Sequence, residues 1–180
     1  MKKSLSKKII IPESVEVTIN ENKIIIKGPK GQNSRTFDFG KVHLEKKENE
    51  ILLSHKKATK NEKKIINTIV AHLKNMIRGV QEKFEYKLKI CSSHFPINVK
   101  IEGNKVIIKN FLGEKVGREM IIPEGAEVTL DKEIITVTST NREIAGQAAA
   151  NFEKITKIRN KDKRVFQDGI YIINKIGRDI

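Results

Sequence analysis

The sequence has little of what secreted, membrane and zinc-ribbon proteins need. It contains one cysteine and no tryptophan among 180 residues. A single cysteine excludes a disulfide framework and a cysteine-rich zinc ribbon, and it suits a reducing compartment. The longest apolar runs, such as 9–11 and 69–71, are far shorter than the roughly 18 residues of a membrane span. The basic start of the chain is followed by only three isoleucines before Pro12, so we expect no export signal.

Sequence motifs of catalysis are also missing. There is no G-x-x-x-x-G-K-[ST] loop, no G-x-G-x-x-G after a predicted strand and no G-x-S-x-G nucleophile elbow. The stretch 28–31 is rich in glycine but starts no helix, and we interpret it as a hairpin turn. Cys91 and His94 are spaced like half of a metal site, yet no other histidine has a matching spacing. We therefore predict that the protein is not an enzyme and has no catalytic residues, cofactor or metal site.

Positive charge is what the sequence has in excess. Lysine and arginine number 36 against 22 aspartates and glutamates, which leaves a formal net charge of +14. Because 38% of the residues are hydrophobic and fall in periodic patterns, this charge belongs to a folded protein rather than a disordered tail. Such a protein is attracted to polyanions, and nucleic acid ranks before an anionic membrane. Without tryptophan, a membrane-surface helix is disfavoured, so we predict no membrane partner.

The first half of the chain changes from strand period to helix period. Apolar residues alternate at 15–19, and 23–27 runs back after a short turn, which predicts a hairpin. Shorter strand candidates follow in two places, at 41–44 and 51–54. Thr59 and Glu62 have the spacing of a capping box, and apolar residues then recur at helical spacing as far as Gly79. This part of the chain therefore predicts strands covered by one amphipathic helix.

The same order of features recurs in the second half. The stretch 22–27 reappears as 104–109 at an offset of 82 residues. Six apolar helix positions recur 79 residues later, behind a second capping box at 140–143. A closer local match, of 122–130 to 11–19, has an offset of 111 residues, which puts the second helix too soon after it. We therefore interpret that match as two similar turn-and-strand segments and take the offset near 80 as the structural repeat.

The repeat predicts the fold class. We expect an α+β protein of two tandem duplicated domains, each an antiparallel β-sheet with one packed α-helix. The predicted domains are 1–81 and 82–180, and the second ends in a basic C-terminal tail without a counterpart in the first.

Two clusters of positive charge are candidate nucleic-acid contacts. The first has five lysines in the expected loop before the first helix, at positions 56, 57, 60, 63 and 64, and it is equally well explained as a solvated surface. The second, between 154 and 164, has six basic residues and one acid, Asp162, for a local charge of +5. Cations on a folded platform favour phosphate binding. Because few aromatics are available for base stacking, we expect a structured RNA bound through its backbone.

Several blocks of sequence occur together in the order of one known family. The principal blocks are 94–99 (HFPINV), 110–115 (NFLGEK) and 159–171, with 24–31 and 75–80 in support. They resemble the large-subunit ribosomal protein six family, called protein nine in eukaryotes, over nearly the whole chain. The block 110–115 and the Phe-x-Asp-Gly-Ile-Tyr ending are similar to the archaeal and eukaryotic branch rather than the bacterial one.

The resemblance implies a structural constituent of the large ribosomal subunit that binds and stabilises large-subunit ribosomal RNA. It also implies contacts with neighbouring large-subunit ribosomal proteins, and a site near the sarcin-ricin loop where elongation factors dock. The location would be the cytoplasmic ribosome, with the nucleolus during assembly if the source is eukaryotic. Two alternatives remain: a free-standing RNA-binding or ribosome-assembly module, and a nucleic-acid-processing enzyme that uses Mg²⁺ and scattered carboxylates.

The resemblance also assigns individual residues. The implied RNA-binding residues are Lys154, Lys157, Arg159, Lys161, Lys163, Arg164, Lys115 and Lys175. Asp168 and Gly169 are implied to form the turn that fixes the tail, and Gly113 is assigned to another turn.

Overall fold

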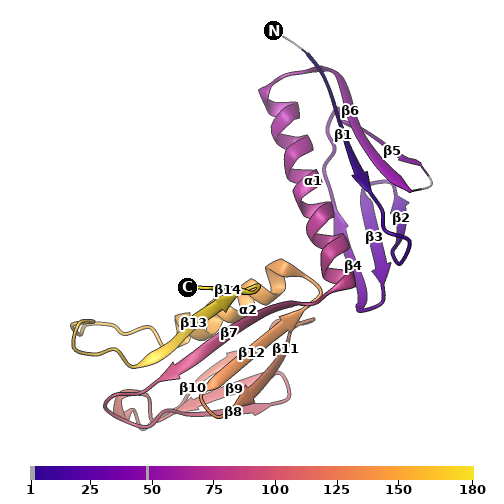
Figure 1. Ribbon diagram of the computed structural model, residues 1–180. Helices are drawn as coiled ribbons and strands as arrows, with labels where there is room; N and C mark the ends of the chain where they lie inside the picture. The colour runs from indigo at the N-terminus through magenta and orange to yellow at the C-terminus, as the bar shows by residue number, and fades with distance from the viewer. Residues whose placement is uncertain (1–2, 48) are drawn as a thin grey trace. The chain divides into compact units, whose positions relative to one another are not determined.

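The chain folds into two units, Met1–Lys83 and Phe84–Ile180, in a computed structural model that describes residues 3–47 and 49–180 (Figure 1). Each unit contains one long helix and several antiparallel strands. The α+β class and the duplication predicted from the sequence are confirmed. The boundary between the units follows Lys83, whereas the sequence repeat had predicted it after residue 81.

The first unit contains two antiparallel sheets of three strands rather than one continuous sheet. One sheet has the order β1 (Lys3–Ile10), β6 (Glu50–Ala58), β5 (His43–Lys47). The other has the order β2 (Glu16–Asn20), β3 (Lys23–Gly28), β4 (Gly31–Thr36). The predicted hairpin is the pair β2 and β3. The sequence patterns missed β1 and β4, because β4 has no apolar residue at all and β1 lacks regular alternation.

Helix α1 (Lys60–Gln81) begins at the predicted capping box. The Thr59 hydroxyl accepts a hydrogen bond from the Asn61 N–H, and the Glu62 carboxylate accepts one from the Thr59 N–H. Hydrogen bonds from the Thr59 side chain and backbone lower the pKa of Glu62 to about 2. The helix buries its apolar face, including Ile66 and Leu73, in the core of this unit. A capped start and one apolar face explain why the sequence located this helix well.

The first lysine cluster does not form a loop as predicted. Strand β6 continues to Ala58, so lysines 56 and 57 lie on a strand, and lysines 60, 63 and 64 lie on the first turns of α1. The strand extends beyond its apolar residues because β1 supplies hydrogen-bonding partners as far as Ala58. A polar segment with such a partner needs no apolar alternation of its own.

The second unit repeats this plan and adds to it. Its smaller sheet has the order β10 (Arg118–Ile121), β9 (Lys105–Lys109), β8 (Asn98–Glu102). Its larger sheet has the order β11 (Glu127–Asp131), β12 (Ile134–Ser139), β7 (Phe84–Cys91), β13 (Gly169–Lys175), β14 (Arg178–Asp179). A short 3-10 helix, η1, spans Phe111–Gly113, and helix α2 spans Arg142–Ile155. Asn22 and Asn104 occupy equivalent positions in the two units. The Asn22 carbonyl accepts a hydrogen bond from the Phe37 N–H, and the Asn104 carbonyl accepts one from the Ile122 N–H, both at 2.8 Å.

The basic segment that was predicted as a C-terminal tail is part of the folded second unit. After the basic residues the chain enters β13, which pairs antiparallel with β7 along its length (Figure 1). Helix α2 packs against both strands and buries Ala148, Ala149 and Phe152 against Leu88 and Ile170. The basic residues therefore lie in a connection that is held at both ends by the core of the second unit. No helix in the described part of the chain is both long and apolar enough to cross a membrane.

Candidate nucleic-acid interface

The candidate interface is the basic segment, residues 154–164, together with the side chains around the end of α2. All eight predicted RNA-binding residues are exposed: Lys154, Lys157, Arg159, Lys161, Lys163, Arg164, Lys115 and Lys175. Exposure is what phosphate contact requires, but it does not tell which of these residues lie close together. The surrounding contacts show that.

The start of the basic segment is attached to strand β13 by Thr156. This residue is 3% exposed, and its hydroxyl donates to the Phe152 carbonyl at 3.1 Å and accepts from the Ile170 N–H at 3.0 Å. Ile158 is also buried, while Lys157 and Arg159 on either side of it are exposed. The backbone is thereby anchored every second residue, and the two cations point to solvent from a fixed platform.

The far part of the segment is organised by its single acid. The Asp162 carboxylate accepts hydrogen bonds from the Arg164 backbone N–H at 3.0 Å and from its Nη2 at 2.8 Å. These bonds from Arg164, the side-chain bonds first, lower the pKa of Asp162, and the same pair raises the pKa of Arg164. The Asp162 carbonyl also accepts from the Val165 and Phe166 N–H groups, which closes a short turn.

The Asp162 carboxylate therefore pairs with Arg164, and the other cations of the basic segment have no carboxylate partner within it. Lys154, Lys157, Arg159 and Lys163 have no hydrogen bond or ion pair from their side chains within residues 3–47 and 49–180. Arg164 itself has a side chain that is 90% exposed. Since an exposed ion pair is held only weakly, its guanidinium can exchange Asp162 for a phosphate.

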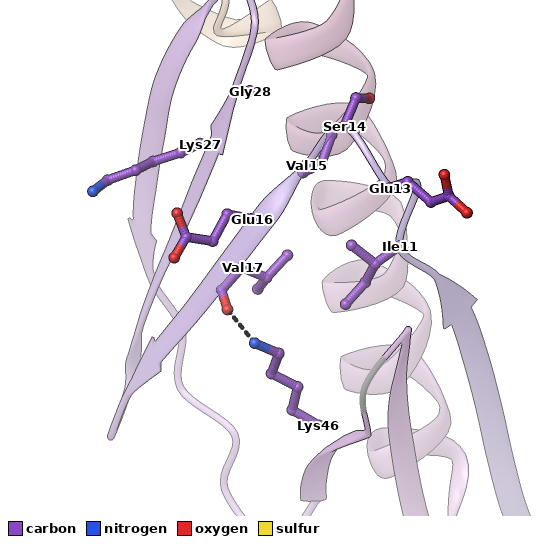
Figure 2. A pocket seen from close by; sticks show the side chains of 9 residues that line it. All are labelled: Ile11, Glu13, Ser14, Val15, Glu16, Val17, Lys27, Gly28 and Lys46. Carbon is purple, nitrogen blue, oxygen red and sulfur yellow. Dashed lines mark hydrogen bonds between the residues drawn. The ribbon is translucent and has the colours of Figure 1, made fainter.

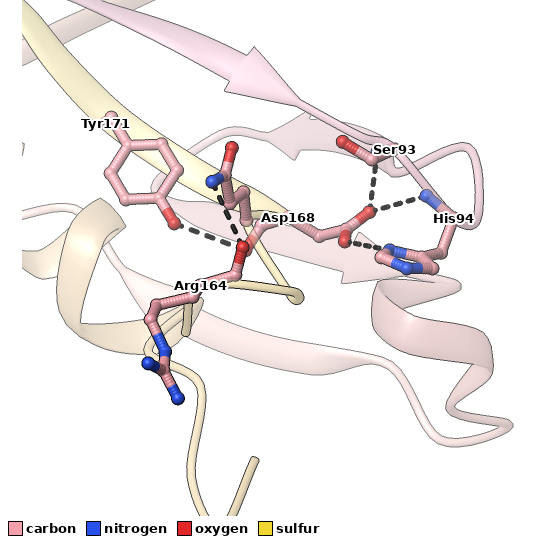
Figure 3. A network of polar contacts seen from close by, with 6 residues as sticks. Ser93, His94, Arg164, Asp168 and Tyr171 are labelled. Carbon is pink, nitrogen blue, oxygen red and sulfur yellow. Dashed lines mark hydrogen bonds and ion pairs between the residues drawn. The ribbon is translucent and has the colours of Figure 1, made fainter. Parts of the chain in front are cut away.

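Asp168 connects the end of this region to the loop after β7 (Figure 3). Its Oδ1 accepts from the backbone N–H groups of Ser93 at 2.7 Å and His94 at 2.9 Å, and its Oδ2 lies 2.6 Å from the His94 Nδ1. Burial alone raises the pKa of Asp168, but the hydrogen bonds from His94 and Ser93 outweigh it, and the pKa is lowered. The His94 ring stacks on Phe166, with 4.9 Å between ring centroids.

The spacing of Cys91 and His94 resembles half of a metal site, but the structure gives His94 a different partner. His94 is engaged by Asp168. Among the residues that the structure describes, there is no group of three or more histidines, cysteines, aspartates or glutamates that could hold a metal ion.

Arg118 attaches the block 110–115 to the end of α2. Its Nη1 donates to the Ile155 carbonyl at 2.5 Å, and its Nε and Nη2 donate to the two carboxylate oxygens of Glu114 at 2.8 and 2.6 Å. The guanidinium also lies over the Phe111 ring, 4.3 Å from its centroid. Hydrogen bonds from Arg118 lower the pKa of Glu114. Sequence reasoning missed Arg118, because it lies outside both charge clusters and reaches α2 only in the fold.

Three uncompensated cations gather in a surface hollow beside Arg118. The hollow has a volume of about 460 Å³ and is lined by Arg118, Glu119, Met120, Asn151, Lys154, Ile155, Lys157 and Arg159. Its one carboxylate, Glu119, is paired with Lys105 at 2.8 Å. A second hollow, of about 550 Å³, is lined by Lys154, Lys157 and Lys163 and by one carboxylate, Glu153, which accepts a hydrogen bond from the Ile172 N–H at 3.1 Å. Lys154 and Lys157 border both hollows and are the centre of the positive surface.

Two of the eight predicted residues lie apart from this centre. Lys175 is at the opposite end of β13 from Gly169, since Gly169 pairs with Cys91 and Lys175 with Tyr86. A strand of seven residues extends roughly 20 Å, so the structure does not bring Lys175 to the basic segment. Lys115 follows Glu114, which Arg118 links to the end of α2, but Lys115 itself lines neither hollow.

The first unit has a hollow of a different electrostatic character (Figure 2). Its volume is about 550 Å³, and its charged lining residues are two glutamates, Glu13 and Glu16, and two lysines, Lys27 and Lys46. The Lys46 ammonium donates to the Val17 carbonyl at 2.6 Å and joins the β5 and β2 edges of the two sheets. Because the charges balance and one lysine is engaged, this hollow has no excess of charge for a polyanion.

Comparisons with known proteins agree with one another. A family model described as "Ribosomal protein L6" matches residues 11–83 and 95–169. A protein of Methanobrevibacter smithii is 44% identical over 172 residues, which cover 96% of this chain and 97% of that protein. A protein of Methanosarcina mazei is 42% identical over 175 residues, covering 97% and 99%, and one of Methanococcus vannielii is 39% identical over 174 residues, covering 97% and 96%. All three relatives are described as large ribosomal subunit protein uL6.

Proposed function

The chain belongs to the ribosomal protein L6 family, in its archaeal branch, and from this membership we propose that it is a non-enzymatic constituent of the large ribosomal subunit. Its partners are then large-subunit ribosomal RNA and neighbouring ribosomal proteins, and its location is the ribosome in the cytoplasm. The role is structural: cations placed between phosphates allow RNA helices to pack closely. We also propose a position near the sarcin-ricin loop, where elongation factors dock.

One observation supports the RNA-binding role most directly. Lys154, Lys157 and Arg159 converge at the end of α2 without counter-ions, on a backbone anchored by Thr156 and Ile158. Fixed cations gain more from a phosphate than mobile ones, because less side-chain and backbone freedom is lost on binding. We propose that this group contacts the RNA backbone together with Lys161, Lys163 and Arg164. Lys115 and Lys175 are proposed as separate, peripheral contacts.

The test replaces five cations of the basic segment with alanine: Lys157, Arg159, Lys161, Lys163 and Arg164. The binding of full-length protein to a large-subunit ribosomal RNA transcript is then measured by filter retention. We expect an unchanged fold by circular dichroism and an affinity for RNA at least about 100-fold lower. Each phosphate contact that is removed also removes the favourable release of counter-ions from the RNA. Undiminished affinity in this variant would contradict the proposed site.

A matched control separates this site from the general effect of net charge. The control variant replaces five exposed lysines of the first unit with alanine, at positions 23, 30, 41, 47 and 74. It loses the same formal charge, and we expect a much smaller loss of affinity. A second experiment addresses the alternative of an assembly module. A ribosomal constituent sediments with large subunits through a sucrose gradient after a high-salt wash, whereas an assembly factor is lost from mature particles.

A further inference from the structure

We propose that Asp168 is a positioning residue for RNA binding that acts through His94 and Phe166 on Lys161. The proposal rests on the proposed function and adds a mechanism to it. Asp168 itself is 1% exposed and has no access to RNA. Its effect is on the orientation of a cation that does.

The first link is a connection between two distant parts of the chain. A buried carboxylate is costly unless its oxygens are hydrogen-bonded. All three hydrogen bonds to the Asp168 carboxylate come from Ser93 and His94, which are 75 and 74 residues away in sequence. Asp168 follows the basic segment by a few residues, so these bonds hold the end of that region against the loop after β7.

The second link passes from His94 to Phe166. With its backbone N–H and its Nδ1 both bonded to Asp168, the His94 ring has a defined position. It stacks on the Phe166 ring at an interplanar angle of 25°. Phe166 is only half-buried, so a neighbour that covers part of its ring restricts the rotamers it adopts.

The third link passes from Phe166 to Lys161. The Lys161 Nζ lies over the Phe166 ring, 4.5 Å from its centroid, which is the geometry of a cation–π contact. A free lysine samples many rotamers and loses them on binding. A lysine that rests on an aromatic ring has lost part of that freedom already, and its three N–H donors remain able to reach phosphate oxygens. Asp168 therefore lowers the entropic cost of the Lys161 contact.

A double-mutant cycle in the full-length protein tests the connection. RNA affinity is measured for Asp168→Asn, Lys161→Ala and the two combined, with the transcript used above. Each single change should weaken binding on the order of threefold to tenfold, the effect of one poorly ordered side chain. The double variant should bind RNA no more weakly than whichever single variant has the lower affinity, because Asp168 has nothing to position once Lys161 is gone. Losses that multiply would overturn the proposal.

Lys154→Ala provides the matched control for the cycle. Lys154 is an exposed cation of α2, and in the described part of the chain its side chain has no hydrogen bond, ion pair or ring contact with Asp168, His94 or Phe166. Its loss should therefore multiply with that of Asp168→Asn. A purely structural role of Asp168 predicts the same coupling to both lysines. If the five-alanine variant keeps full affinity, the proposed function fails; if that variant loses affinity while Asp168→Asn does not, only the positioning role fails.

A second variant keeps the test decisive if Asp168→Asn does not fold. Phe166→Leu leaves the Asp168 carboxylate and its three hydrogen bonds in place but removes the aromatic ring. We expect the same coupling to Lys161→Ala. In addition, the Lys161 side-chain methylene protons should be shifted upfield in the NMR spectrum of the wild type by the ring current of Phe166, and this shift should be lost in Phe166→Leu. Unshifted methylene protons in the wild type would contradict the proposal.

Discussion

Arg118 caps the C-terminal end of α2, since its Nη1 donates a hydrogen bond to the carbonyl of Ile155, the last residue of the helix, at 2.5 Å. The carboxyl end of a helix carries partial negative charge, which repels phosphates. Arg118 places a cation at that end, next to Lys154 and Lys157. Glu114 and the Phe111 ring hold the guanidinium in this position. The surface proposed to face RNA is therefore positive despite the helix dipole.

Replacing Arg118 with alanine should destabilise the second unit. The change removes hydrogen bonds to the Ile155 carbonyl and the Glu114 carboxylate, and charged hydrogen bonds that are partly exposed contribute ~1–2 kcal/mol. Arg118→Lys should recover only part of this, since an ammonium cannot reproduce the planar, bidentate contact. Urea unfolding followed by circular dichroism measures the effect. Arg159→Ala, which removes an exposed arginine nearby, should change the free energy of unfolding by less than about 0.5 kcal/mol.

The Glu114–Arg118 pair should make stability depend on pH in the acid range. The pKa of Glu114 is lowered from its ordinary value of 4.5, so its contribution to stability is fully present above that value. It is lost as the pH falls through the lowered pKa of the folded state. We expect the difference in urea midpoint between wild type and Glu114→Gln to shrink as the pH is lowered from above 4.5 through the lowered pKa of Glu114. A difference that stays constant over this range would contradict the assignment.

Replacing Gly28 with alanine should destabilise the first unit. An added Cβ would lie 2.8 Å from Val80 Cγ2 and 2.9 Å from the Val80 carbonyl oxygen. That carbonyl is held in place by the Lys30 N–H at 2.9 Å, so the backbone cannot easily move away. Overpacking of this kind costs ~1–3 kcal/mol, measurable as a lower urea midpoint. Gly117→Ala is the control, since its nearest contact would be an ordinary 3.4 Å.

Single lysine substitutions should separate RNA-facing cations from solvated ones. Lys157→Ala should weaken RNA binding and reduce the slope of log affinity against log salt by about 1, because one phosphate contact is lost. Lys74→Ala, which removes an exposed lysine of α1, should leave the slope unchanged. Titrations at several salt concentrations provide the measurement. Equal slopes for Lys157→Ala and wild type would remove Lys157 from the proposed contact.

The same titrations address the peripheral residue Lys175. Lys175 is separated from the basic segment by the length of β13. We expect Lys175→Ala to combine multiplicatively with the five-alanine variant, as an independent contact does. A Lys175→Ala change without any effect on affinity would remove it from the set of RNA-binding residues.

The sequence by itself determined the features that depend on local physical signals. Alternation of apolar residues located β2 and β7, the apolar run that returns after a short turn located β3, and a capping box followed by helical spacing located α1. The same helical spacing recurring near an offset of 80 predicted the duplication, and the order of the sequence blocks predicted the family; both predictions are confirmed. The second predicted capping box, at 140–143, is wrong, since the N-cap of α2 is Asn141, whose side chain accepts from the Glu143 N–H. The excess of charge in residues 154–164 was also visible, because charge is counted along the chain.

Only the tertiary structure decided which groups meet across the chain. Strand β4 has no apolar residue, and it forms because β3 supplies its hydrogen bonds. The pairings of Asp168 with His94 and of Arg118 with Ile155 join residues that are 74 and 37 positions apart. No local pattern encodes such contacts, since a polar side chain is satisfied by whichever partner the fold brings within hydrogen-bonding distance. For that reason the sequence identified the cations of this protein, and the fold decided which of them lie on anchored backbone and which lie close together.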